Sequence, residues 1–115
     1  MKNNFLLIST WWGFDYKPGN IKMYINVDGS FTLKKEYAFP KDKKENREKK
    51  GLIDQKRMAE IRELIEKNVT KDSHNLIFDA GYEIEYKKGD KVIKVVNDME
   101  LWEKIIKLIP EFNEF

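Results

Sequence analysis

Residues Ile21 to Tyr37, IKMYINVDGSFTLKKEY, decide the fold of this chain. Apolar residues alternate with polar ones from Ile21 to Val27, and the apolar positions resume at Phe31 and Leu33. A period of two is typical of an antiparallel strand with one buried face and one solvated face. The stretch therefore predicts a β-hairpin.

The turn of this hairpin follows from the parity of the apolar positions. A two-residue loop would place Ile25 opposite Thr32 and divide the apolar side chains between the two faces. A three-residue loop over residues 27–29, with Gly29 in the left-handed conformation of a type I turn plus G1 bulge, places Ile25 opposite Phe31. We expect the three-residue loop, because it keeps the apolar side chains on one face.

A second hairpin is predicted further along the chain, with regular alternation over residues 82–86. Gly89 and Asp90 fit a two-residue type II′ turn. This turn places Ile84 opposite Val95, so that apolar side chains again meet on one face. A separate apolar strand is expected over Phe5 to Thr10, covered on both faces.

Two amphipathic helices complete the pattern. In the first helix Asp54 is the expected N-cap, Asn68 can close the C-terminal end, and the apolar positions recur at helical spacing. The second helix opens at Asn97 or Asp98 and is stopped by Pro110. If Asn97 is its N-cap, Glu100 falls at the third helical position and completes a capping box.

These elements predict a single α+β domain over residues 1–115. We expect two layers, with a mainly antiparallel sheet of about five strands and both helices on one face, in the order β-β-β-α-β-β-α. Residues 41–51 are assigned to a charged, solvent-exposed connection, because residues 41–50 hold six basic and three acidic residues. Strand order does not follow from these patterns.

Composition narrows the functional classes. The net charge of +2 gives no strong field for steering nucleic acid. Cysteine is absent, which excludes disulfides and thiolate chemistry. The apolar run Phe5 to Ile8 is shorter than the roughly seven residues of a signal-peptide core. We expect a cytoplasmic protein that does not associate with a membrane.

Few residues are candidates for catalysis. Glu83 and Glu85 share one face of a strand, as paired acid–base carboxylates do. Lys94 is predicted opposite Glu85, however, and favours an ion pair instead. The single histidine and the scattered aspartates match no metal-binding spacing. We expect no enzyme activity, metal or cofactor, although carboxylate chemistry stays open.

Residues 11–17, WWGFDYK, hold most of the candidate binding residues, since four of the seven are aromatic. Aromatic side chains offer a large contact area at a small entropy cost. On an extended backbone Trp11 and Trp12 point to opposite faces, so at most one faces the helices. The alternatives are core packing and a protruding contact loop. The candidate binding residues are Trp11, Trp12, Phe14, Tyr16, Lys17 and Tyr24.

We expect a small non-catalytic module that binds another protein and acts by occupying it. Its size and element order resemble those of small bacterial inhibitor and immunity proteins, which implies the same mode of action. One alternative is a small-ligand or nucleotide pocket between sheet and helices, lined by Trp11, Tyr82 and Trp102.

A second alternative is a weak nucleic-acid contact through residues 41–50, which the interspersed acidic residues disfavour. A homodimer through an edge strand or the open sheet face is compatible with each of these functions.

Overall fold

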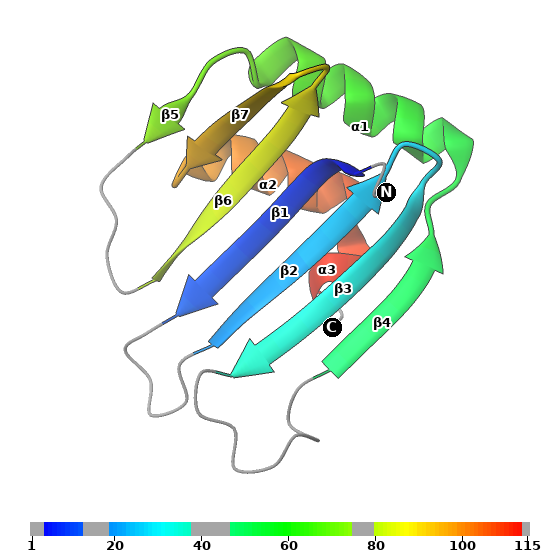
Figure 1. Ribbon diagram of the computed structural model, residues 1–115, viewed down its shortest axis with the longest axis vertical. Helices are drawn as coiled ribbons and strands as arrows, with labels where there is room; N and C mark the ends of the chain where they lie inside the picture. Colours follow the sequence, from blue (N-terminus) through cyan, green and yellow to red (C-terminus); the bar gives the residue numbers. More distant parts are fainter. Residues whose placement is uncertain (1–3, 13–18, 38–46, 75–79, 114–115) are drawn as a thin grey trace.

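A seven-stranded sheet forms one layer of the described structure, and helices form the other (Figure 1). The computed structural model describes residues 4–12, 19–37, 47–74 and 80–113. Along the sheet the strand order is β4-β3-β2-β1-β6-β7-β5. Neighbouring strands are antiparallel, except that β5 pairs with β7 in parallel. The strands are β1 (Asn4–Trp12), β2 (Gly19–Asn26), β3 (Ser30–Tyr37), β4 (Arg47–Leu52), β5 (Ser73–His74), β6 (Ala80–Lys88) and β7 (Lys91–Val96).

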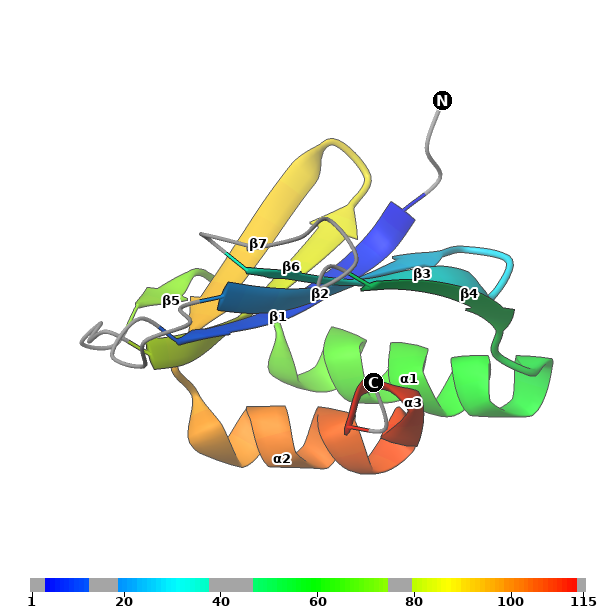
Figure 2. The same cartoon turned by 90° about the horizontal axis from the view of Figure 1, so that it is seen from below.

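The helices lie on the same side of the sheet, and the core fills the space between the two layers (Figure 2). They are α1 (Gln55–Asn68), α2 (Met99–Leu108) and α3 (Pro110–Asn113). No element in the described part of the chain covers the other side of the sheet. The two-layer α+β prediction is confirmed, whereas the expectation that Phe5 to Thr10 is covered on both faces is not.

Both predicted hairpins have the expected register. Ile25 lies opposite Phe31 in the first hairpin, and Ile84 lies opposite Val95 in the second. Gly29 has a φ of 94°, and its N–H donates to the carbonyl oxygen of Asn26 at 3.0 Å. The parity of apolar side chains was therefore sufficient to fix both pairings.

Both helix starts fall at residues that the sequence predicts, and the structure decides between the two residues predicted for α2. Asp54 caps α1 by accepting from the N–H of Arg57 at 2.8 Å, as predicted. The cap of α2 is Asp98, which accepts from the N–H of Leu101. Asn97 instead has a φ of 57°, and its Oδ1 accepts from the N–H of Tyr82 at 2.9 Å. The predicted capping box with Asn97 as N-cap is therefore wrong.

The predicted count of five strands and two helices was too low. The edge strand β4 begins at Arg47, inside the segment that we expected to be a connection. Residues Arg47 to Lys50 are all exposed, so β4 shows no apolar alternation by which a sequence could reveal it. Where β4 reaches the core, the ring of Phe31 on β3 lies over Gly51 and takes the space of a side chain.

Two shorter elements also escaped prediction. β5 has only two residues, too few for a recognisable pattern. α3 follows Pro110, and its Phe112 is buried against the core. Next to Phe112, the carboxylate of Glu111 receives two hydrogen bonds from the guanidinium of Arg57 on α1, at 2.9 and 2.6 Å. These hydrogen bonds therefore hold α3 against α1.

Candidate functional site

The candidate site is the side of the sheet that the helices leave uncovered. Because side chains alternate along each strand, the residues between the buried ones belong to this side. We define the open face as the following side chains on β1, β2, β3, β4, β6 and β7: Leu7, Ser9, Trp11, Asn20, Lys22, Tyr24, Thr32, Lys34, Glu36, Glu48, Lys50, Glu83, Glu85, Lys87, Val92 and Lys94.

The strand pairing arranges the open face in rows that cross the central strand β1. In the row through Ser9, Lys22 lies on one side and Glu83 on the other. In the next row, Leu7 lies between Tyr24 and Glu85. The two rows therefore place Lys22 and Tyr24 on the β2 side of β1, and two carboxylates on the β6 side.

The acidic side is partly neutralised. The ammonium of Lys94 lies 3.5 Å from a carboxylate oxygen of Glu85 and 4.0 Å from one of Glu83. Lys94 lies directly opposite Glu85, as the sequence predicts. Two carboxylates share this ammonium, and a second basic side chain, Lys87, lies on the same face of β6. This arrangement favours a structural role for the pair over acid–base catalysis.

The β2 side of the open face also mixes charges. Lys22 and Lys34 lie directly opposite each other on β2 and β3, and like charges in that position destabilise a sheet. On β4, Glu48 lies directly opposite Lys34, although within the described residues no carboxylate lies within 4.0 Å of the ammonium of Lys22 or Lys34. The ammonium of Lys34 lies 5.9 Å from the centre of the Tyr24 ring.

Trp11 and Trp12 lie on opposite sides of the sheet, and each covers a glycine on a neighbouring strand. The Trp11 indole lies over Gly81 of β6, on the open face. The Trp12 indole lies on the helix side over Gly19 of β2, where its ring meets Tyr37 edge-on at 6.3 Å between centres. Both indoles are half-buried.

The remaining candidate residues divide between the open face and the undescribed part of the chain. Tyr24 lies on the open face, half-buried beside Leu7. Phe14, Tyr16 and Lys17 lie outside the described residues. Leu7 was not a candidate, since its position on the open face depends on β1 being the central strand, and strand order does not follow from periodicity.

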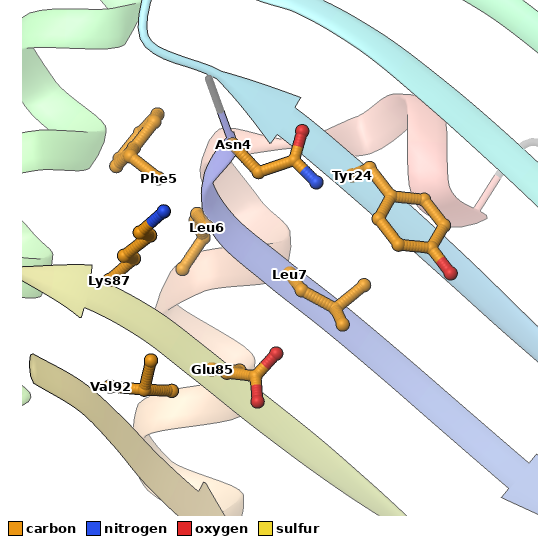
Figure 3. A pocket seen from close by; sticks show the side chains of 8 residues that line it. All are labelled: Asn4, Phe5, Leu6, Leu7, Tyr24, Glu85, Lys87 and Val92. Carbon is orange, nitrogen blue, oxygen red and sulfur yellow. The ribbon is translucent and has the colours of Figure 1, made fainter. Parts of the chain in front are cut away.

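A shallow depression of about 270 Å³ lies at one end of the open face (Figure 3). Leu7 lies between Tyr24 and Glu85 at its base, and Val92 of β7 borders it. Val92 is 49% exposed, which is high for a branched apolar side chain in a strand. The full lining is Asn4, Phe5, Leu6, Leu7, Tyr24, Glu85, Lys87 and Val92.

The three aromatic residues expected to line a ligand pocket are not brought together. Tyr82 stacks on Trp102 of α2, with 5.2 Å between ring centres. Burial raises the pKa of the Tyr82 hydroxyl. Trp11 lies over Gly81 on the opposite side of the sheet. The three side chains therefore cannot line one cavity between sheet and helices.

The described residues include no group of three or more histidine, aspartate or glutamate side chains that could hold a metal ion. No helix in that same part of the chain has the length and apolar character needed to cross a membrane. In the comparisons with known proteins, no protein-family model matches the chain, and no curated protein matches it in sequence.

Proposed function

We propose that this chain is a non-catalytic protein-binding module whose contact surface is the open face. The observation that carries this proposal is the group of apolar and aromatic side chains on the open face. Leu7, Trp11 and Tyr24 are half-buried there, and Val92 is exposed. Burying such side chains against a partner is favourable by roughly 25 cal/mol per Å² of apolar surface.

The arrangement of the open face has the anatomy of a protein interface. Interfaces combine an apolar and aromatic centre, enriched in Trp and Tyr, with charged groups at the rim. Trp11 and Leu7 lie on the central strand, and the charged groups of Lys22 and Glu83 flank it. The protein acts by occupying its partner, as an inhibitor or immunity-type protein does. The candidate residues Phe14, Tyr16 and Lys17 follow Trp12 in the sequence and remain candidates for contact with the partner.

Two observations favour a protein partner over the other ligand classes. Glu83 and Glu85 lie on the same face as Lys22 and Lys34, and carboxylates repel the phosphates of nucleic acid. The Tyr82 and Trp102 rings stack on each other, so they do not offer a free aromatic wall to a small ligand.

Site-specific photo-crosslinking tests the proposal. The photoreactive residue p-benzoylphenylalanine replaces Tyr24 on the open face in one variant and Met99 on α2 in the control. Met99 is 59% exposed, so accessibility alone would favour the control. We expect a discrete protein adduct in cells from position 24 and none from position 99. Equal adducts from both positions, or none from position 24, would contradict the proposal.

A further inference from the structure

We propose that the partner that fits the open face is a second copy of this chain, packed face to face about a two-fold axis parallel to β1. This inference rests on the proposed function, because it uses the open face as the contact surface. It goes further by identifying the occupant. The reason is that two pairs of polar side chains beside β1, Lys22 with Glu83 and Tyr24 with Glu85, face each other under this one symmetry operation.

The central position of β1 makes the self-complementarity possible. β2 and β6 lie on either side of β1, at equal distances of about 4.8 Å. Lys22 of β2 and Glu83 of β6 both pair with Ser9, so they lie at the same height along β1. A basic group and an acidic group are therefore placed symmetrically about the central strand.

Consider a two-fold axis that runs parallel to β1, midway between two open faces. Rotation about this axis exchanges the β2 side of β1 with the β6 side and leaves every position along β1 unchanged. β1 then faces β1 of the second copy, and β2 faces β6. Each Lys22 faces Glu83 of the other copy, so the contact is made twice, as an isologous interface requires. Lys34 then faces Val96 of the second copy and Lys94 faces Thr32, so the charge match is confined to Lys22 and Glu83 beside β1.

The same operation brings apolar groups together at the axis. Leu7 lies on β1 itself, so it faces Leu7 of the second copy. Tyr24 faces Glu85, where a phenol hydroxyl can donate to a carboxylate. Trp11 lies farther along the same strand and extends the apolar centre. The interface thus has an apolar middle and charged flanks.

The twist of packed sheets does not disturb this match. Aligned sheets pack about 10 Å apart and cross at about 30°. A rotation of about 30° moves a group that lies about 4.8 Å from the axis by only about 2.5 Å along the strand. The long side chains of Lys22 and Glu83 can bridge such a displacement.

The other face-to-face orientation is disfavoured by charge. A two-fold axis in the plane of the sheet but perpendicular to β1 places β6 over β6. Glu83 then faces Glu85 of the second copy, and like charges across an interface cost several kcal/mol. Charge therefore selects the axis parallel to β1.

Two charge-reversal variants test the inference. In a Lys22→Glu dimer, Glu would face Glu83 twice, and in a Glu83→Lys dimer, Lys22 would face Lys twice. We expect the wild-type chain to sediment as a dimer and each variant alone to dissociate, with a dimer Kd raised by about tenfold or more. An equimolar mixture of the two variants restores opposite charges at both contacts. The mixture should therefore sediment as a dimer.

The mixture also controls for misfolding, because two misfolded variants could not form a dimer with each other. Lys56→Glu and Glu60→Lys on the exposed surface of α1 serve as matched controls, and both should leave the wild-type dimer unchanged. A mixture that stays monomeric overturns the inference.

If the wild-type chain is monomeric and position 24 gives an adduct with a different protein, the homodimer is contradicted and the proposed protein-binding function is retained. A monomeric chain without such an adduct overturns both.

Discussion

The indole ring of Trp11 lies directly over the α-carbon of Gly81, its cross-strand partner on β6. A β-carbon built on Gly81 would lie 2.6 Å from Cζ2 of Trp11 and 2.5 Å from Oδ1 of Asn97. Any side chain at position 81 would therefore displace the indole, the Asn97 side chain or both. The glycine lets the ring lie close to the sheet, near the end of the central strand.

Gly81→Ala should displace the Trp11 indole and destabilise the protein by about 1–3 kcal/mol, because the added methyl group overpacks the site. Urea unfolding monitored by circular dichroism measures this change. Gly81→Ala should lower the free energy of unfolding by less in a Trp11→Ala background, because the indole ring is absent there. Equal costs in the two backgrounds would show that the ring and the glycine are not coupled.

Lys22 lies opposite Lys34, and the repulsion between the two ammonium groups destabilises the folded chain. Lys22→Gln should therefore raise the stability of the dilute monomer by about 0.2–1 kcal/mol at low salt. The gain should shrink as salt screens the repulsion. Thermal unfolding at two ionic strengths measures it, with Lys56→Gln on α1 as the control. A stability that falls at low salt would mean that Lys22 has a favourable contact within the chain.

The contact between α3 and α1 predicts a dependence on pH. Burial is the largest single influence on the pKa of Glu111 and raises it. The hydrogen bonds and charge of Arg57, a backbone hydrogen bond and the charge of Lys49 together outweigh burial and hold that pKa below its ordinary value. A carboxyl with a lowered pKa stabilises the fold above its unfolded pKa, and this stabilisation is lost as the pH falls through the folded pKa. The free energy of unfolding should therefore fall between about pH 5 and pH 3.

Glu111→Gln removes the titrating group at this contact, so its stability should fall less steeply over the same pH range. Urea unfolding at several pH values compares the two chains. Parallel pH profiles for the wild type and the variant would contradict an ionic contact with Arg57.

Much of the fold could be predicted from the sequence, because burial leaves a period in it. Ile25 and Phe31 reveal a hairpin register, since a shift by one residue would expose them. β4 leaves no such trace, because its side chains are exposed and the space at Gly51 is filled by Phe31.

The candidate site could be predicted only in part. Alternation shows that Trp11 and Trp12 face opposite sides, but not which of them faces the helices. That assignment depends on β1 lying between β2 and β6, a long-range pairing that leaves no local pattern. The charge balance between Lys22 and Glu83 depends on the same strand order, so it becomes visible only in the folded sheet.

Lysine footprinting tests most directly whether a partner covers the open face in cells. The side chains of Lys22 and Lys34 lie on that face, whereas Lys56 and Lys67 of α1 point away from it and are exposed. Acetylation rates of each lysine are measured by mass spectrometry, in cells and in the dilute purified monomer. We predict acetylation of Lys22 and Lys34 that is several-fold slower in cells, with Lys56 and Lys67 unchanged. Equal rates for all four lysines in the two settings would contradict a contact surface on the open face.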